Sequence, residues 1–454
     1  MASNSNILDI KPVIAIFCLA LLLRLIFFGT IAIKNPPGFF EVDSHGYWKI
    51  ADNLLKSQTF SLSETAPLHA DHSRTPLYPL FLAGIRALGL KATGIILIQI
   101  MFSAITCIVV IMLAERLTSN PFIGYVSGLL CALDIPSISL ANLLLTETLF
   151  TLLLTLSLYF LVLYRIEGRK GNLIASAALM GSATLCRPIA VYLPFLLPFL
   201  LIGTGWRKII TSTLIYLIIS FLVICPWLLR NKIVFGHPIL STIAYNNLLD
   251  YRAAGIYSIK NKISLEEARE ELQQKLDHEF TADRVANPIE YKKKAAGLAL
   301  EVIIGHPFIY LKNHLISVGN MLFKPLRSNI DIQFGLAKKG SALTSWGKQE
   351  KTSLLVRIRQ QTSLVTIILV IIQLVLLIIM WLSFSYGLLI CLFSKEYKVF
   401  GFLTLMLFYF ALTSGGPEAY ARFRVPLLTF LAIGSGYGLS CLWNRKAFQR
   451  ETRC

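Results

Sequence analysis

Long apolar runs recur from one end of the chain to the other, and short polar stretches separate them. About 18 or more mainly apolar residues are enough to cross a bilayer as a helix. The pattern therefore predicts an all-α, polytopic membrane protein with about ten transmembrane helices. Their approximate ranges are 12–33, 93–114, 121–136, 143–164, 172–186, 189–205, 209–228, 364–392, 399–415 and 425–443.

Two polar segments, at about 34–92 and 229–363, are too long to be simple turns between these helices. All 7 histidines and most of the acidic residues fall within them. They divide the chain into an N-terminal transmembrane module (1–228), an outer-face helical region (229–363) and a C-terminal transmembrane module with a short tail (364–454). Because the polar groups gather on one side of the membrane, we expect the working site there.

The polar segments contain amphipathic patterns that predict surface helices. In the first segment, Asp43 or Ser44 is the expected N-cap of a helix with an apolar stripe. The stripe consists of Tyr47, Ile50, Ala51 and Leu54. In the second, Ser264-Leu265-Glu266-Glu267 is a capping box, Asn287-Pro288 opens a helix that ends near Gly305, and His306-Pro307 opens another.

The distribution of positive charge predicts the orientation of the chain in the membrane. Only 15% of the residues are charged, yet the formal net charge is +18. The cations lie in short loops between the spans, where they indicate which loops are cytoplasmic, and anionic lipid or phosphate is expected as a further ligand for some of them. They do not form one aromatic-rich patch, which argues against a nucleic-acid partner. The cations are Arg116, Arg165, Arg169, Lys170, Arg207, Lys208, Lys395, Lys398, Arg445, Lys446, Arg450 and Arg453. Both termini are predicted to be cytoplasmic, and both polar segments lie on the opposite side.

Two carboxylates are candidates for chemistry. Asp43 lies where the chain leaves the first span, beside Ser44, His45 and Tyr47. It is placed to act as a general base, and the alternative is that it only caps a helix.

Glu147 lies at the outer end of the fourth span, where a charge costs on the order of 3 kcal/mol on insertion scales and marks a functional position by default. The alternative for Glu147 is a structural ion pair with Arg187 or Arg24.

Four arginines lie at outer span ends, against the positive-inside bias: Arg187, Arg230, Arg422 and Arg424. Arginine binds phosphate through two parallel hydrogen bonds and stays charged in a semi-apolar site. Each arginine alone is explained as well by an interfacial anchor. Together they predict a phosphate site on the outer side.

Other recognisable motifs are few. The stretch His69-Ala70-Asp71-His72 offers ligands for a divalent metal, and an ordinary surface loop is the alternative. The sequence has no Walker loop, dinucleotide fingerprint or Gly-x-Ser-x-Gly elbow. This absence argues against an ATP-driven pump or a serine hydrolase.

In their order along the chain, these motifs resemble the GT-C superfamily of membrane glycosyltransferases, specifically the bacterial family 39 and 83 type. That group includes protein O-mannosyltransferases and the aminoarabinose transferase that modifies lipid A. The matching pieces are Arg24, Asp43-Ser44 with Tyr47, Arg74-Thr75-Pro76-Leu77-Tyr78-Pro79, Thr146-Glu147, Arg187-Pro188, Pro226-Trp227, Arg230-Asn231, His306-Pro307 and Arg422-Phe423-Arg424 with Pro426.

The resemblance implies a glycosyltransferase that moves a sugar from a polyprenyl-phosphate donor to a cell-envelope acceptor (a lipid, a glycan or a protein). Asp43 is implied as the base of an inverting displacement, with Glu147 as a second carboxylate. The resemblance implies that Arg422 and Arg424 face the donor phosphate, and Arg74, Arg187 and Arg230 are further candidates for binding it. His45, Tyr47 and Tyr78 complete the expected site. The implied location is a bacterial inner membrane, with the site facing the periplasm or the exterior.

Three other functions remain open at this point. A flippase or transporter of lipid-linked glycans would need ionisable groups along a path through the bilayer. An O-antigen polymerase would favour arginine-rich outer loops without an acidic motif in the first one. A purely structural membrane protein would leave the one-sided polarity unexplained.

The orientation gives a first testable prediction. Because the cations favour the cytoplasmic side, reporter fusions at about residue 168 and residue 270 should report opposite compartments. The measurement is the paired activity of a cytoplasm-active and a periplasm-active reporter at both positions. The same compartment at both positions would contradict the predicted topology.

Overall fold

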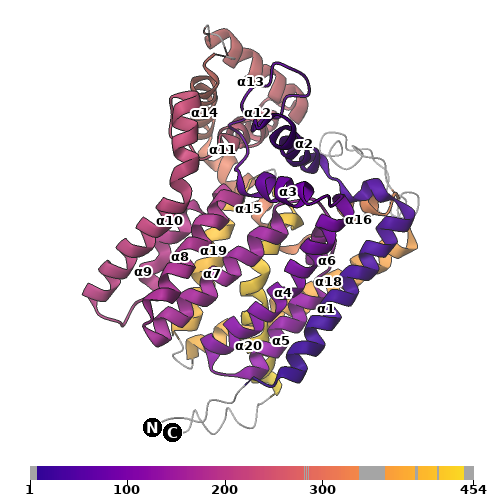
Figure 1. Cartoon of the computed structure of the whole chain (residues 1–454), viewed down its shortest axis with the longest axis vertical. Helices are drawn as coiled ribbons and strands as arrows, with labels where there is room; N and C mark the ends of the chain where they lie inside the picture. The colour runs from indigo at the N-terminus through magenta and orange to yellow at the C-terminus, as the bar shows by residue number, and fades with distance from the viewer. Residues whose placement is uncertain are drawn as a thin grey trace.

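The computed structural model describes residues 8–336, apart from 281, 283 and 285, and residues 363–443, apart from 394–396 and 417–418. The predicted tail cations Arg445, Lys446, Arg450 and Arg453, together with Lys395, lie outside these ranges. The described helices form a long bundle with a smaller group of helices at one end (Figure 1). Within these ranges no strand forms, and the only β-type pairing is an isolated bridge between Ser61 and Ala70. The all-α fold predicted from the sequence is confirmed.

Six segments of the described chain are long and apolar enough to cross a membrane. They are α1 (Ile10–Lys34), α4 (Ala92–Thr118), α7 (Glu147–Glu167), α10 (Trp206–Phe235), α18 (Leu364–Phe393), and η5 (Ala421–Leu427) continued by α20 (Leu428–Trp443). The count rises to 8 if two bent pairs each form one span: α5 (Pro121–Leu133) with α6 (Ile135–Ala141), and α14 (Pro288–Gly305) with α15 (Pro307–Phe323).

The predicted count of ten is therefore not confirmed. Every predicted span coincides with helical structure, but four of the ten do not form a single helix that is long and apolar enough to cross a membrane. One is the span predicted at 121–136, which is divided between α5 and α6. The others are α8 (Lys170–Cys186), α19 (Tyr397–Ser414), and η2 (Pro188–Leu196) followed by α9 (Leu197–Leu200). Pro188 and Pro194 remove backbone donors from the last of these segments, which favours a 3-10 turn over a continuous α-helix.

The bend between α5 and α6 has an identifiable local cause. Asp134 separates the two helices, which meet at 59°. Its carboxylate accepts a hydrogen bond from the main-chain N–H of Ser137 at 2.9 Å, and so caps α6. Pro136 lies in the first turn of α6, where proline needs no hydrogen-bond partner.

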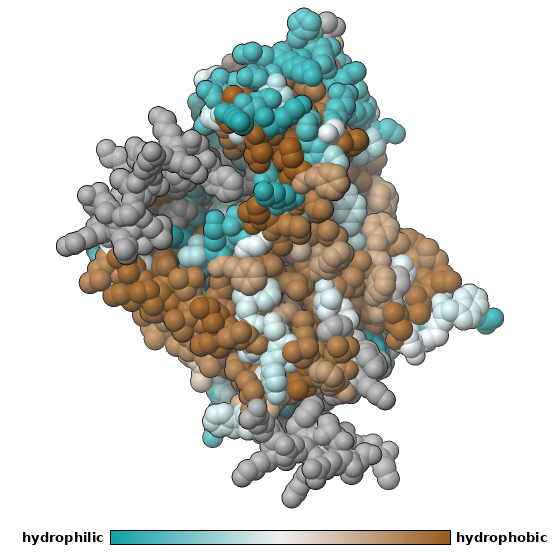
Figure 2. All heavy atoms as spheres, turned by 180° about the vertical axis from the view of Figure 1, so that it is seen from behind, coloured by the Kyte–Doolittle hydropathy of each residue, from teal (hydrophilic) through white to brown (hydrophobic). Residues whose placement is uncertain are grey.

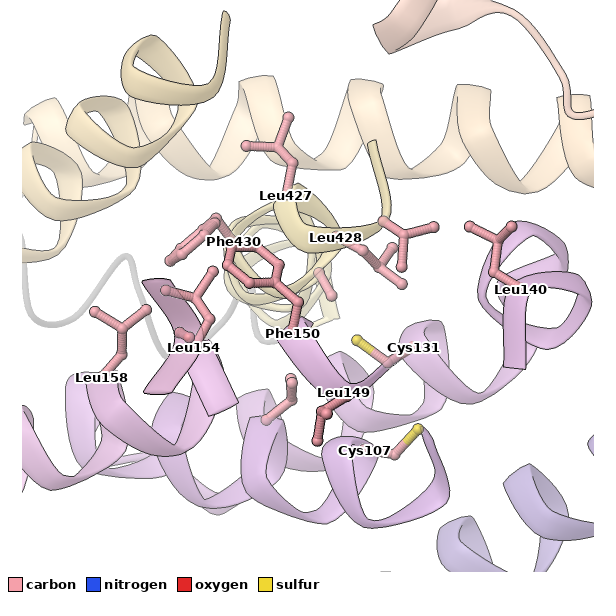
Figure 3. Close-up of a cluster of buried hydrophobic side chains, with 14 of the residues drawn as sticks. Cys107, Cys131, Leu140, Leu149, Phe150, Leu154, Leu158, Leu427, Leu428 and Phe430 are labelled. Carbon is pink, nitrogen blue, oxygen red and sulfur yellow. The ribbon is translucent and has the colours of Figure 1, made fainter. Parts of the chain in front are cut away.

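Close backbone contact joins α18 to α20. A side chain added at Gly438 would place its Cβ 1.9 Å from the carbonyl oxygen of Ser383, and one at Gly387 would lie 2.4 Å from that of Gly434. Small residues allow this approach, which drives helix association inside a bilayer. α20 is consequently the central helix, and its side chains pack with those of α4, α5 and α7 in the apolar core (Figure 3).

The two predicted outer segments meet at one end of the bundle (Figure 1). The first contains α2 (Val42–Ser57) and α3 (Leu77–Ala87). The second contains α11 (Ile243–Asn247), η3 (Leu248–Ala253), α12 (Ala254–Asn261), α13 (Leu265–Glu279), α14, α15 and α16 (Ser328–Gln333). His72 and Thr242 connect them: Nδ1 of the imidazole lies 2.8 Å from Oγ1 of the threonine. Figure 2 shows this end as hydrophilic and the body below it as mainly hydrophobic.

The helices predicted for the outer segments are largely confirmed. Ser264 and Glu267 form the expected capping box of α13, and α14 and α15 begin and end close to the predicted residues. The predicted cap of α2 was wrong. Its N-cap is Glu41, whose main-chain N–H donates to Ser44 Oγ at 2.9 Å. Asp43 therefore lies within the first turn of α2, and its carboxylate is not needed as the cap.

Candidate functional site

Arg422 is the centre of a network of charged side chains at the end of the bundle where the two predicted outer segments meet. It lies on η5, and its side chain is 7% exposed. Its Nη1 donates to Oδ2 of Asp43 at 3.0 Å, and its Nε donates to Oε1 of Glu147. One guanidinium thus joins the two carboxylates that the sequence marked as candidates.

Asp43 has both carboxylate oxygens engaged. Oδ1 accepts from Nη2 of Arg74 at 2.9 Å, while Oδ2 accepts from Arg422. The Asp43 side chain nevertheless remains 32% exposed, so the network opens towards the outside at this residue. Asp43 is thus the most exposed member of the network, followed by Arg74 at 21%.

Arg74 is fixed by the turn that precedes α3. Asp71 accepts from the main-chain N–H of Arg74 at 2.8 Å and from Ser73 Oγ at 2.8 Å, which fixes the direction in which the arginine leaves the turn. The guanidinium then lies over the ring of Tyr47, with its Cζ 4.9 Å from the ring centroid. Its Nη1 also donates to the Tyr47 hydroxyl at 3.3 Å.

Glu147 is fully buried at the start of α7, with 0% exposure. Its Oε1 accepts from both Arg187 and Arg422. Arg187 also donates to Thr146 Oγ1 at 3.1 Å and lies within 5.9 Å of the Phe150 ring centroid. The expected ion pair is thus made with Arg187, and not with Arg24.

Tyr78 supports the network through its contact with Tyr47. Its ring packs edge-on against Tyr47, with centroids 5.1 Å apart, and its hydroxyl donates to Gln99 Oε1 at 2.6 Å. Gln99 in turn donates to the carbonyl oxygen of Leu143 at 2.6 Å. Burial raises the pKa of both tyrosines, so these hydroxyls remain protonated donors at neutral pH.

The structure does not bring Arg424 into the network. Arg424 is 2% exposed, and its Nη1 donates to the carbonyl oxygens of Met321, Leu322 and Lys324 at 2.9–3.1 Å. It thereby satisfies carbonyls at the end of α15. Residues two apart on a 3-10 helix point to different sides, which separates Arg424 from Arg422.

Arg230 and Arg24 also lie apart from the network. Arg230 donates to the carbonyl oxygen of Asp71 at 2.8 Å and lies over the Trp227 ring, so it fastens α10 to the first outer segment. Arg24 is buried in α1 and donates to Ser103 Oγ at 2.7 Å.

The predicted histidines have separate surroundings. His45 stacks on Phe40, with ring centroids 5.3 Å apart. His72 pairs with Thr242, while Asp71 is occupied by the turn before α3. Across the described part of the chain, no three His, Cys, Asp or Glu side chains are placed to hold a metal ion together. The His69–His72 stretch accordingly brings together no such group of three ligands among the described residues.

The network as a whole is cationic. It contains three guanidinium groups (Arg74, Arg187 and Arg422) and two carboxylates (Asp43 and Glu147). If all are ionised, one positive charge is left in excess. An excess charge beside a partly exposed group favours an anionic ligand.

Sequence reasoning gave three residues of the site no role in it. Tyr420 lies with its hydroxyl 3.4 Å from Nη1 of Arg422, Thr146 binds Arg187, and Asp71 orients Arg74. Thr146 and Tyr420 are close in sequence to predicted residues, which was the available signal. Asp71 was considered only as a metal ligand.

Comparisons with known proteins bear on the family that the chain resembles. A family model described as dolichyl-phosphate-mannose-protein mannosyltransferase matches residues 71–229, about a third of the chain. The match includes Arg74, Glu147 and Arg187 of the network. The resemblance to the GT-C superfamily is confirmed. A search of curated proteins finds no match.

Solved GT-C structures align with most of the chain. The oligosaccharyltransferase of Archaeoglobus fulgidus, solved with Zn and sulfate, is 11% identical with a TM-score of 0.49; the alignment covers 96% of this chain and 50% of that one. This chain thus spans about half the length of that protein. ArnT from Cupriavidus metallidurans, bound to undecaprenyl phosphate, is 13% identical with a TM-score of 0.43, covering 94% and 77% of the two chains. Likeness at this level does not identify a substrate.

The ionisation of Asp43 gives a testable prediction. Burial alone would raise the pKa of its carboxyl, but the charges of Arg422 and Arg74 outweigh burial and lower this pKa to about 2 from 3.8. The unfolded chain therefore binds the proton more readily. The stabilisation from the ionised carboxylate is complete above about pH 4 and is lost as the pH falls towards 2, an effect of about 2 kcal/mol.

The measurement compares thermal unfolding of the wild type and Asp43→Asn in detergent between pH 2 and 6. The Tm advantage of the wild type over the variant should shrink as the pH falls through this window. A difference that stays constant with pH would show that the arginines do not depress the pKa of Asp43.

Proposed function

We propose that this protein is a glycosyltransferase that takes a sugar from a polyprenyl-phosphate donor on the non-cytoplasmic side of the membrane. The acceptor is a component of the cell envelope. The observation that carries the proposal is the partly exposed Asp43 carboxylate held between Arg74 and Arg422, at the outer end of the membrane helices. The family description, which names a lipid-phosphate sugar donor, supports the same donor class and favours transfer over transport.

The donor's phosphate matches the charge of the network. A phosphodiester that links a sugar to a polyprenol carries one negative charge, and the network has one positive charge in excess. When the sugar leaves, the phosphate gains a second charge, which the same guanidinium groups stabilise. Groups that bind developing charge more strongly than the ground state accelerate the reaction.

In the proposed reaction, a nucleophilic oxygen or nitrogen of the acceptor attacks the anomeric carbon of the sugar. The bond from this carbon to the phosphate oxygen breaks, and polyprenyl phosphate leaves with the electron pair. Asp43 takes the proton that the acceptor loses. Attack opposite the leaving group inverts the anomeric configuration.

The hydrogen bonds of Asp43 imply an exchange before this step. With both oxygens bound to arginines and its pKa lowered to about 2, the carboxylate is a weak base. The donor's phosphate competes for the same guanidinium N–H groups. Once Arg422 and Arg74 turn to the phosphate, Asp43 loses its positive neighbours and its affinity for a proton rises.

Glu147 has a different role from Asp43 in this proposal. Because it is fully buried and bound by two arginines, it holds Arg422 and Arg187 in place and does not contact the acceptor. Glu147 accepts from Nε of Arg422, so Nη1 of Arg422 is able to release Asp43 and donate to the phosphate instead. The sequence hypothesis of a second catalytic carboxylate is thereby replaced by an anchor for the cations.

Replacement of Asp43 tests the base. Asp43→Asn should lower transfer by about 10²–10⁴-fold, because asparagine cannot accept the proton. Transfer is measured with purified protein, as release of polyprenyl phosphate from a panel of polyprenyl-phosphate hexoses and pentoses in the presence of envelope extract. Binding of polyprenyl phosphate itself should be retained.

The matched control is Asp52→Asn. Asp52 lies on the same helix and also pairs with an arginine, Arg86, outside the network. This variant should retain transfer. Normal turnover by Asp43→Asn at saturating donor would rule out the proposed base, and equal loss in both variants would indicate general damage to α2.

Replacement of Arg422 and Arg424 distinguishes a loss of ligand binding from a loss of stability. Arg422→Gln should weaken polyprenyl phosphate binding at least about tenfold, since hydrogen bonds to charged groups contribute roughly 1.5–3 kcal/mol. Arg422→Lys should restore little of this binding, because a lysine ammonium cannot form the two parallel hydrogen bonds of a guanidinium with a phosphate. Arg424→Gln should lower the Tm and leave binding unchanged, since Arg424 binds the end of α15. Equal binding losses in Arg422→Gln and Arg424→Gln would contradict this separation.

A further inference from the structure

A second group of buried charges lies within the helix bundle. Arg24 of α1 is only 1% exposed. Its N–H groups donate to Ser103 Oγ at 2.7 Å and to the carbonyl oxygens of Ala20, Ala132 and Cys131 at 2.9, 3.3 and 3.5 Å. All of these acceptors are neutral. The guanidinium is therefore solvated by the protein, but its charge is not neutralised by a direct partner.

The surrounding charges do not balance either. Asp134, in the break between α5 and α6, lies within electrostatic range of Arg24 and Arg424. Its hydrogen bonds in the described structure go to the N–H and hydroxyl of Ser137, at 2.9 and 2.8 Å. One carboxylate thus faces two buried guanidinium groups. The remaining positive charge lies among membrane-spanning helices, where an unpaired charge is costly.

A partly open cavity of about 30 Å³ lies between the helices beside Arg24. This is more than the roughly 10–15 Å³ that one water molecule requires. Its wall is rich in hydroxyl and thiol groups, and among the described residues that line it none is acidic. Cys107 and Cys131 belong to this wall, between α4 and α5 (Figure 3).

Hydrogen-bond donors on this wall are left unused. Thr151 is 7% exposed, and its Oγ1 has no hydrogen-bond partner. Ser103 Oγ accepts from Arg24, so its own hydrogen is available to another acceptor. A guanidinium has five N–H groups, and the four contacts of Arg24 leave one over.

We propose that this cavity binds a small monovalent anion, chloride in the cell. The ion accepts hydrogen bonds from Arg24, Ser103 and Thr151, and it neutralises the buried positive charge. Water would satisfy the hydroxyl groups but would leave the charge. Thr151 lies one helical turn beyond Glu147, so the anion stabilises the end of α7 that holds the outer arginines. The site is independent of the proposed sugar transfer.

The test measures the Tm of the purified full-length protein in detergent, in sodium chloride and in sodium gluconate at equal ionic strength. A ligand that binds only the folded state raises the Tm with its concentration. We expect a saturable rise of a few degrees with chloride, and a similar rise with bromide. In crystals grown in bromide, an anomalous scattering peak should lie between Arg24 and Thr151.

Two variants locate the effect, with a matched control. Thr151→Val keeps the side-chain shape and should reduce the chloride-dependent rise, and Arg24→Gln should abolish it. Thr184→Val, at a buried threonine of α8 that does not line the cavity, should leave the rise intact. Three outcomes would overturn the proposal: equal Tm in both salts, a rise unchanged in Thr151→Val, which would place the ion elsewhere, or crystals with no anomalous peak in the cavity, which would indicate water only.

Discussion

The outer site depends on one guanidinium that has to satisfy two carboxylates. Arg422 is 379 residues from Asp43 and 275 residues from Glu147 in the sequence, yet it binds both. Each carboxylate also has a second arginine, Arg74 for Asp43 and Arg187 for Glu147, but only Arg422 joins the two ion pairs into one network. The positions of α2, α7 and η5 are therefore interdependent. The two ion pairs of Arg422 thus hold α2, α7 and η5 together at the boundary between apolar and aqueous surroundings.

The sequence identified the charged residues of the network more reliably than it identified the partner of each one. Asp43, Glu147, Arg187 and Arg422 were all found, because a charge at the outer end of an apolar run is conspicuous. Their pairing was not fixed by that signal. Arg424 satisfies the same criterion as Arg422, yet it binds the end of α15, because a 3-10 turn directs neighbouring side chains differently. The direction of a short turn is set by tertiary packing and leaves little trace in hydrophobic periodicity.

The fold shows a similar limit. Apolar runs located the helices, including α10 and α18, because burial in lipid imposes a length that is visible in the sequence. Interruptions were harder to predict. Asp134 divides a run that reads as continuous, and Glu41 replaces the expected cap of α2. In both places one hydrogen bond between a side chain and the backbone decides where a helix begins, and several neighbouring residues could have supplied that bond equally well.

The contact between Arg424 and α15 has a mechanical consequence. The guanidinium grips three carbonyl oxygens at the end of α15, and Arg424 is two residues from Arg422 on one short, buried turn. The end of α15 is thus fixed directly to the turn that carries the arginine that binds Asp43. α15 is joined to α14 at a bend of 100°. Any shift of α15 relative to α14 at this bend would therefore act on η5, and through η5 on the hydrogen bonds of Asp43.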